Sequence, residues 1–510
     1  VLDHLERTPL TRLTIDYVEG FDMRRRACLY LTYYGHGDTR QRGVALLSFK
    51  QAYRAAGLEL TDEQVTAKAF VKPPDDTPEM RHLLERRAAL GGSLPQRRGK
   101  AMSLPAPELS AFKTVLDGAG EREISTTMAF VRVLASVLRD KTIGPRVVPI
   151  VADESRTFGM EGMFRQLGIF SQVGQLYDPE DAGSLMFYKE DKKGQILQEG
   201  INEAGAMSSW IAAATSYSNH GEPMVPFYVY YSMFGFQRIG DLAWAAGDSR
   251  SRGFLIGGTS GRTTLNGEGL QHEDGHSHLL AAAIPNCKAY DPSFGYEVAV
   301  IVQDGLRRML TEQEDVFYYL TVLNENHRQP ALPEGAEEGI LRGMHRVRSG
   351  TDIQLLGSGA ILREVLHAAD ELATEWGVEA DVWSVTSFTE LARDGNEAAR
   401  HARLHPGDEA PVPYVAQCLS GERGPVVAAT DYQRLFAEQI RPWVPGGTYE
   451  VLGTDGFGRS DYRAALRRFF EVDRFHVVVA ALHALGRADD AAKAIARYEI
   501  DTEGAPPWRR

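Results

Sequence analysis

The sequence predicts an α/β protein made of two doubly wound domains, each with a mostly parallel sheet, preceded by an irregular N-terminal arm. Short apolar runs alternate with longer stretches of helical period, as in VVPIVAD (Val147 to Asp153) and PFYVYYSM (Pro226 to Met233). Runs that are apolar throughout are typical of strands buried on both faces of a parallel sheet. At 510 residues the chain is long enough for several domains with sizeable cores.

Residues 1 to about 105 are expected to form the arm, a docking segment followed by a linker. Leu29 to Gly37 predicts a strand, and Val44 to Ala56 predicts a helix. The stretch from Val71 to Leu109 is rich in proline, arginine and glycine, a composition typical of extended linkers.

A first regular domain is expected over residues 106–330, in which apolar strands alternate with helices. Its main elements, in order, are expected to be helix Thr126–Leu138, strand Val147–Asp153, helix Phe158–Gln166, helix Gly200–Thr215, strand Pro226–Met233, strand Gly253–Gly258, helix Ser293–Leu310 and strand Val316–Leu323.

Residues 340–510 predict a second, smaller α/β domain, joined to the first by a linker from Glu325 to Gly339. Gly357-Ser358-Gly359 follows its first strand without the third glycine of a dinucleotide fingerprint, which predicts a tight strand-to-helix turn. The expected elements are strands near Ile353–Leu356, Asp381–Val385 and Val426–Thr430, and helices at Leu362–Glu375 and Tyr432–Ile440.

Composition excludes several classes of protein. A net charge of −13 argues against sequence-independent binding of nucleic acid, which needs a basic face. The longest apolar runs, such as Val477 to Leu485, are too short to span a bilayer. Three widely separated cysteines, Cys28, Cys287 and Cys418, indicate reduced thiols and a cytoplasmic location.

The stretch from Phe254 to His278 gathers glycines, hydroxyls, three carboxylates and three histidines between two apolar runs. Glycine at this density lets the backbone approach a ligand closely. His272 to His276 match HExxH, a zinc signature that needs both histidines on one face of a helix. Three glycines in or just before the motif each cost a helix about 1 kcal/mol relative to alanine. We therefore expect an organic ligand here and no metal-ligand set.

Three carboxylates are candidate site residues. Glu203 lies among small residues at a predicted helix start, where burial would raise its pKa and make it a proton donor to a ring nitrogen. The alternative is a solvated helix glutamate. Asp153 and Glu154 end a strand, at the edge where parallel sheets bind ligands. Helix capping by Asp153, with Glu154 paired to Arg156, explains this pair equally well.

An aromatic run marks the end of one strand. Such rings usually belong to the core, but beyond a strand end they can form a flat stacking surface for a heterocycle. The members of the run are Tyr228, Tyr230, Tyr231, Phe234 and Phe236.

Taken together, these segments resemble the bacterial homodimeric-type pyruvate dehydrogenase, the decarboxylating first component of the 2-oxo acid dehydrogenase complex, in the transketolase-like thiamine-diphosphate superfamily. The resemblance runs from about Glu85 to the C-terminus and implies a pyrimidine-binding domain followed by a C-terminal domain of the transketolase type. Seven blocks carry it, from Glu123 to Leu134, Ala152 to Ile169, Tyr188 to Ala206, Tyr230 to Leu242, Gly253 to His278, Thr386 to Gly395 and Val451 to Asp461.

The resemblance also implies roles for individual residues. Glu203 matches the glutamate that hydrogen-bonds the aminopyrimidine ring of thiamine diphosphate, and Phe234 matches the aromatic residue that stacks on that ring. Tyr231, Glu154 and His272 match residues that face the substrate, where an imidazole can donate to a developing oxyanion. Three more residues lie in matching cofactor-side blocks: Asp153, Glu268 and His276.

One part of the family's pattern is missing. Family members carry a GDG motif and a later asparagine, which hold Mg²⁺ and the diphosphate. No GDG occurs in this sequence, and its start resembles that domain only loosely, around Thr32 to Gly43. The resemblance therefore implies that a GDG-bearing α-type subunit completes the cofactor site and holds Mg²⁺, in an α2β2 assembly, unless the sequence belongs to a longer chain.

The implied reaction is cleavage of a small 2-keto substrate, with pyruvate first, and transfer of the two-carbon unit to a lipoyl group of an acyltransferase or carrier partner. One alternative is a split transketolase-like enzyme that passes a two-carbon unit from a ketose phosphate to a lipoyl or acyl carrier in secondary-metabolite biosynthesis. Another is a non-catalytic assembly subunit.

Overall fold

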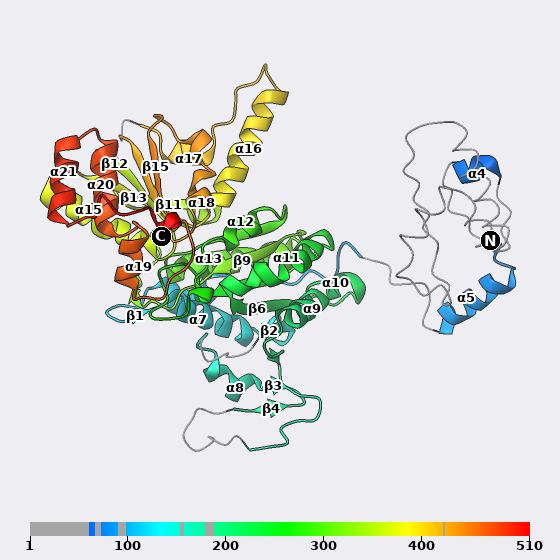
Figure 1. Cartoon of the computed structure of the whole chain (residues 1–510). Helices are drawn as coiled ribbons and strands as arrows, with labels where there is room; N and C mark the ends of the chain where they lie inside the picture. The colour runs from blue at the N-terminus through cyan, green and yellow to red at the C-terminus, as the bar shows by residue number, and fades with distance from the viewer. Residues whose placement is uncertain (1–60, 67–72, 90–97, 153–157, 179–187, 422–423) are drawn as a thin grey trace, which may run out of the picture. The chain divides into compact units, whose positions relative to one another are not determined.

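The computed structural model describes residues 61–66, 73–89, 98–152, 158–178, 188–421 and 424–510 (Figure 1). The chain divides into two compact units, Val1–Pro95 and Gln96–Arg510. None of the described helices is both long and apolar enough to cross a lipid bilayer.

Two helices are described in the first unit, α4 (Asp62–Thr66) and α5 (Pro78–Ala89). The expectation of an extended linker is wrong over α5. Proline at the first helical position suits a helix start, and the residues that follow are mostly good helix formers. The strand and helix predicted before residue 57 lie outside the described residues.

The first domain of the second unit contains a six-stranded sheet in which all neighbouring strands are parallel. Its strands are apolar because both faces are covered. In spatial order they are β5 (Leu197–Gln198), β2 (Val147–Val151), β6 (Val225–Tyr231), β7 (Phe254–Gly258), β9 (Phe317–Thr321) and β8 (Cys287–Tyr290).

Alternate side chains of the central strand β6 enter the two faces of this sheet. Phe227 and Val229 join one core cluster, which also holds helices α7 and α13. Tyr228 and Tyr230 join the other, which holds helices α9 and α11. These helices are α7 (Thr126–Arg139), α9 (Glu203–Ala214), α11 (Ser232–Asp248) and α13 (Gly295–Leu306).

Shorter elements complete this domain. The helix predicted at Phe158–Gln166 begins three residues later, and strand β8 was not predicted. Besides short 3₁₀ turns, the other described elements are α6 (Lys113–Leu116), β1 (Glu123–Ile124), α8 (Glu161–Leu167), β3 (Ile169–Phe170), β4 (Glu190–Asp191), α10 (Ser216–Asn219), α12 (Ser277–Ala282), a π-helical turn (Arg307–Thr311) and β10 (His327–Arg328).

The second domain contains a five-stranded sheet in which β11 is an antiparallel edge strand and the other pairs are parallel. In spatial order its strands are β11 (Met344–Arg348), β13 (Ala380–Val385), β12 (Ile353–Gly357), β14 (Val426–Ala429) and β15 (Tyr449–Leu452). Gly357-Ser358-Gly359 forms the predicted strand-to-helix turn, and Gly359 has a left-handed φ of 49°.

Helices cover both faces of this second sheet (Figure 1). One face carries α15 (Ile361–Trp376), α20 (Arg474–Ala484) and α21 (Ala488–Arg497). The other carries α16 (Phe388–Leu404), α17 (Tyr414–Cys418) and α18 (Leu435–Glu438). Two more helices, α14 (Glu337–Arg342) and α19 (Arg463–Phe469), lie before β11 and after β15 in the chain.

The predicted linker from Glu325 to Gly339 is ordered, which corrects the prediction. It contains β10, which pairs with β1, and the start of α14. Glu325 itself pairs with Arg363 of α15 and Arg467 of α19. Its polar and proline-rich composition resembles a linker, but charge pairing to the second domain fixes it in place.

Candidate active site

The candidate site lies at the carboxyl end of β6, the edge where parallel sheets bind ligands. Tyr231 is the last residue of the strand, and α11 begins at the next residue. Phe234 is therefore in the first turn of α11, beside the strand end. The neighbouring strand β7 ends at Gly258, which pairs with Tyr231 and leads into the histidine-containing loop.

Three rings from two segments form an aromatic shelf, defined by Tyr231, Phe234 and His272. The His272 ring stacks on Tyr231, with centroids 5.4 Å apart and planes 10° apart. The same ring meets Phe234 edge-on at 5.2 Å. All three side chains are half-buried. The shelf is thus partly open, as a stacking surface for a planar ligand must be.

Glu203 is the first residue of α9 and is buried, with 9% of the residue exposed. Asn202 caps the helix by accepting the Gly205 backbone N–H at 3.0 Å. A helix N-terminus carries partial positive charge, which favours a carboxylate. The prediction that Glu203 is buried is confirmed.

Arg238 connects the carboxylate to the shelf, and sequence reasoning missed it. A terminal nitrogen of its guanidinium pairs with Glu203 Oε1. Its Cζ lies 4.2 Å from the centroid of the Phe234 ring. Phe234 and Arg238 are four residues apart on α11 and so share a face, a spacing that could have revealed the contact.

The contacts of Arg238 indicate what kind of ligand fits between Glu203 and Phe234. The guanidinium is planar, nitrogen-rich and cationic, and it stacks on Phe234 while it donates to Glu203. A protonated aminopyrimidine offers the same combination of a flat face and an N–H donor. The aromatic ring and the carboxylate therefore suit the pyrimidine of thiamine diphosphate.

The remaining polar residues of the loop divide between the site and the scaffold. Glu268 Oε2 lies 3.4 Å from His272 Nδ1, and His276 Nε2 lies 3.0 Å from Gln237 Nε2 on α11. Predicted residues Glu268, His272 and His276 are thus brought to the shelf or to α11. Gln237 was not among the predicted residues.

The HExxH match does not form a zinc site. His272 ends a single 3₁₀ turn, Glu273 has an extended backbone, and His276 precedes helix α12. Among the described residues, one group of side chains is close enough to share a metal ion, with donor atoms within 4.8 Å. That group is His401, His405 and Asp408, so it includes neither histidine of the motif.

The motif's other residues brace the loop. Asp274 accepts the backbone N–H groups of His276 and Ser277, each at 3.0 Å. Burial raises the pKa of Glu273 to about 8, and its carboxyl accepts the Arg459 backbone N–H at 2.8 Å. His278 is fully buried, and burial lowers its pKa to about 4.

The aromatic run splits between the two predicted roles. Tyr228, Tyr230 and Phe236 are buried in the core cluster with α9 and α11, whereas Tyr231 and Phe234 belong to the shelf. Phe158, which was not predicted, packs against Tyr231 at 5.1 Å. Two candidates, Asp153 and Glu154, lie outside the described residues.

Comparison with protein families gives three matches along the chain. Residues 103–330 match the pyruvate dehydrogenase E1 component middle domain, and residues 343–473 match the transketolase-like C-terminal domain. Residues 1–69 match the nitrate reductase delta subunit. The loose likeness of Thr32 to Gly43 to a diphosphate-binding domain stays a prediction, because this match does not test it.

Curated relatives agree with the first two matches. The pyruvate dehydrogenase E1 component of Pseudomonas aeruginosa is 63% identical over 494 residues, covering 93% of this chain and 56% of the relative. That of Cupriavidus necator is 57% identical, covering 93% of this chain and 55% of the relative. That of Escherichia coli K12 is 56% identical, covering 88% of this chain and 51% of the relative. This chain thus spans about half the length of these relatives.

Solved structures show the fold. Transketolase from Leishmania mexicana superposes with a TM-score of 0.54 at 18% identity, covering 80% of this chain and 52% of the transketolase. Transketolase from Campylobacter jejuni gives 0.53 at 16% identity, covering 73% and 49%. With two transketolase-type α/β domains that match by sequence as well, this chain resembles the bacterial pyruvate dehydrogenase E1 component, of which it holds the middle and C-terminal domains.

Proposed function

We propose that this chain supplies the pyrimidine-binding half of a thiamine-diphosphate site that decarboxylates pyruvate and passes the two-carbon unit to a lipoyl group of a partner protein. The observation that carries the proposal is the buried carboxylate of Glu203 beside the half-open ring of Phe234, linked through Arg238. A carboxylate and a stacking ring are the two groups an aminopyrimidine needs. The identity to pyruvate dehydrogenase E1 components supports pyruvate as the substrate.

Bound thiamine diphosphate would supply a carbon nucleophile for the 2-keto group. In this proposal Glu203 holds a proton at the ring nitrogen of the pyrimidine, and Phe234 fixes the plane of the ring. Arg238 then leaves the face of Phe234, since the pyrimidine takes its place. A buried carboxylate at a helix N-terminus holds such a hydrogen bond without competition from water.

The substrate side of the site is assigned to His272 and Tyr231, with Glu154 as predicted. The stack of His272 on Tyr231 fixes the plane of the imidazole, so that its N–H can donate to a developing oxyanion. Glu268 accepts at the other ring nitrogen and sets the tautomer. Asp153 and His276 are proposed to shape the cofactor side.

The diphosphate and its Mg²⁺ need a GDG-bearing segment, which we propose is supplied by a polypeptide outside these 510 residues, either joined to them or as an α-type subunit. No GDG occurs among the 510 residues. A lipoyl-bearing acyltransferase or carrier would receive the two-carbon unit, as the E1 resemblance implies.

The test combines this chain with the N-terminal half of a pyruvate dehydrogenase E1 component, thiamine diphosphate and Mg²⁺. Pyruvate decarboxylation is followed with an artificial electron acceptor, and lipoyl acylation is followed separately. Glu203→Gln is expected to lower turnover by about 10²–10⁴-fold, because it removes the proton-holding group. Glu222→Gln is the control, because Glu222 pairs with Arg146 at the surface and should leave turnover unchanged.

Two outcomes would contradict the proposal. Equal turnover in Glu203→Gln would remove Glu203 from the chemistry, and no turnover with any GDG-bearing partner would favour an assembly role. Consumption of a ketose phosphate in preference to pyruvate would replace the substrate.

A further inference from the structure

A second polar site, which shares no residue with the aromatic shelf, lies mainly in the C-terminal domain. A cavity of about 600 Å³ opens between α15, α19 and α20, with Glu325 on its wall. Its charged lining consists of five arginines, three carboxylates and one histidine: Arg363, Arg463, Arg467, Arg468, Arg474, Glu325, Glu364, Asp473 and His367. We name this cavity the arginine pocket.

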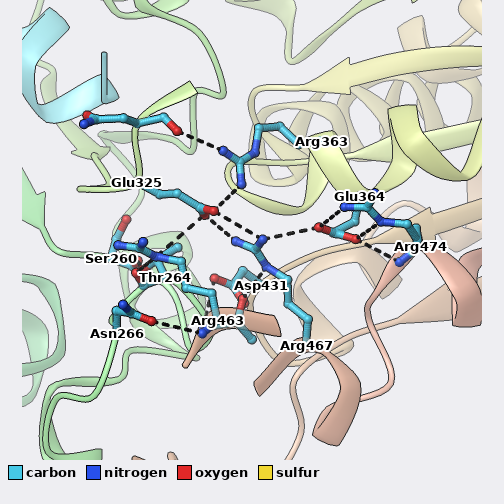
Figure 2. Close-up of polar contacts among 12 residues, drawn as sticks. Ser260, Thr264, Asn266, Glu325, Arg363, Glu364, Asp431, Arg463, Arg467 and Arg474 are labelled. Carbon is cyan, nitrogen blue, oxygen red and sulfur yellow. Dashed lines mark hydrogen bonds and ion pairs between the residues drawn. The ribbon is translucent and has the colours of Figure 1, made fainter. Parts of the chain in front are cut away.

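Two of the three carboxylates of the arginine pocket, Glu325 and Glu364, are already paired with arginines (Figure 2). Glu325 pairs with Arg363 and Arg467. Glu364 accepts from Arg467 at 3.3 Å and from Arg474 Nε at 3.0 Å. The pKa values of both glutamates are lowered by these arginines despite burial, so both are charged at neutral pH.

Asp473 is also occupied. Its carboxylate caps α20 by accepting the His476 backbone N–H at 2.9 Å and also binds the His476 ring. Five arginines against three carboxylates leave an excess of two positive charges in the lining, with the histidine neutral.

Arg463 and Arg474 have terminal guanidinium nitrogens without a protein acceptor among the described residues. Arg463 donates from Nε to the Thr264 carbonyl at 2.6 Å, while neither of its terminal nitrogens has a hydrogen-bond partner among the described residues. Arg474 uses Nε and Nη2 on Glu364, which leaves Nη1 without a partner there. Both residues line the cavity, and their side chains are 29% and 34% exposed.

The electrostatics of the lining indicate crowding of like charge. Burial lowers the pKa of Arg463; the nearby Glu325 raises it, while Arg467 and Arg363 lower it further. Burial also lowers the pKa of His367, and Arg474 adds to that effect. A bound anion would reduce the repulsion between these positive charges. An ion network with a purely structural role would not require N–H donors that lack an acceptor.

We propose that the arginine pocket binds a small molecule that carries a phosphate group, held directly by Arg463 and Arg474. A phosphate monoester carries close to two negative charges at neutral pH, which matches the excess in the lining. Guanidinium groups suit tetrahedral oxyanions because each offers several fixed N–H donors. Arg467 and Glu364 are positioning residues, since they fix the network from which Arg463 and Arg474 project.

The volume and wall also suit a small organic molecule. About 600 Å³ falls in the range of small-molecule sites. Phe475 and Tyr498 line the same cavity with their rings 4.5 Å apart, and they offer an apolar wall beside the charges. This site is separate from the proposed thiamine-diphosphate site, and its test does not depend on that proposal.

The test is calorimetric titration of the full chain with inorganic phosphate and pyrophosphate at constant ionic strength. Arg463→Met should weaken binding at least tenfold, because it removes the terminal nitrogens proposed to hold the phosphate. In the fold it removes one hydrogen bond to the Thr264 carbonyl and a 4.0 Å ion pair with Glu325. Arg474→Met should also weaken binding. Arg497→Met is the matched control, because Arg497 lies on α21 and pairs with Glu375 outside the pocket.

A second readout is the His367 ring resonance, which should shift with phosphate in the wild type and in Arg497→Met but not in Arg463→Met. No saturable binding would overturn the proposal. Binding that is equal in Arg463→Met and the wild type would also overturn it, as would a response to ionic strength alone. Thermal melting of each variant separates loss of binding from loss of fold.

Discussion

At the scale of single residues, Arg238 links the Glu203 carboxylate to the Phe234 ring. Burial makes a lone carboxylate costly, and pairing with the guanidinium offsets that cost. The same contact covers the ring that a flat ligand would need. Binding of a heterocycle at this place must therefore exchange one planar N–H donor for another, which keeps the carboxylate paired throughout.

His278 gives a prediction about acid stability. Its Nε2 lies 2.9 Å from Thr321 Oγ1, and burial lowers its pKa to about 4, against about 6.5 in an unfolded chain. Because the folded pKa is lowered, the stabilising contribution is complete above pH 6.5 and is lost as pH falls toward 4. His278→Phe is expected to remove the hydrogen bond to Thr321. It should also remove the part of the acid destabilisation that comes from protonating His278.

The measurement is the free energy of unfolding in urea at several pH values between 7 and 4. The wild-type-minus-variant difference in unfolding free energy should fall by roughly 3 kcal/mol from pH 7 to pH 4, because the pKa of His278 is about 4 in the folded protein and about 6.5 in the unfolded chain. Taking the difference cancels groups common to both proteins, such as Asp431, whose pKa burial raises to about 7. A difference that stays constant with pH would contradict the prediction.

The residues of the site could be predicted in part. Glu203, Phe234, Tyr231 and His272 were predicted from their resemblance to a family, and the structure brings them together. Arg238 was missed because a charged residue on a helix is usually solvated, and only its spacing from Phe234 marks it.

At the scale of elements, α9 and α11 carry the site because each begins at a side chain that the site uses. α9 begins at Glu203, and α11 follows directly on Tyr231. The two helices pack together on one face of the sheet, which fixes the Glu203–Arg238 pair. Small errors in where either helix begins would separate the two charges.

A helix cap therefore has a specific role at this place. Asn202→Ala is expected to cost about 1 kcal/mol of folding free energy and also to weaken binding of thiamine diphosphate, because Glu203 is the next residue. Ser125→Ala is the matched control, since Ser125 caps α7 by accepting the Met128 N–H at 3.2 Å. Fluorescence titration with the cofactor and a GDG-bearing partner measures cofactor binding, and urea unfolding measures folding free energy. Together they distinguish an effect on binding from an effect on stability. If both variants bind equally well, the cap does not position the carboxylate.

Apolar strands were the elements that sequence predicted best. β6 and β7 are buried along nearly their whole length, so their runs are distinctive. The edge strand β11, MHRVR, and the short β15 were missed because half of their residues are polar or partly exposed. α5 was missed because proline and arginine on an exposed helix resemble a linker.

At the scale of the whole second unit, the C-terminal domain braces the loop that carries His272. The Gly267 backbone N–H donates to the Asp461 carbonyl at 3.0 Å, and Glu273 accepts from Arg459. Thr263 Oγ1 donates to Asp431 at 2.8 Å. In these hydrogen bonds the block from Val451 to Asp461 contacts the loop and no ring of the shelf. It therefore acts on the site by holding the loop in position.

Sequence could not predict this coupling, because it depends on residues nearly 200 positions apart. Gly267 and Asp461 have no local signal that joins them, and the partnership exists only once both sheets have formed. The resemblance located the two blocks, while the contacts between them required the structure.

The domain interface gives the last prediction. Glu297 of α13 is fully buried and accepts from Ser384 Oγ at 2.6 Å, and its carboxylate lies 2.7 Å from His345 Nε2. Both partners belong to the sheet of the other domain. Glu297→Ala leaves them buried without an acceptor, which should cost about 3 kcal/mol or more. Glu338→Ala removes a surface pair with Arg342 and should cost less than about 1 kcal/mol.

Hydrogen exchange separates a local from a global effect of this substitution. Because Glu297 joins the domains, its loss should let the C-terminal sheet open while the sheet of the first domain stays closed. Amides of β12 should then lose protection from exchange, and amides of β6 should keep most of theirs. Equal loss in both sheets would mean that the interface is not a boundary between cooperative units. The His272 loop should then exchange faster together with β12, because its braces come from that domain.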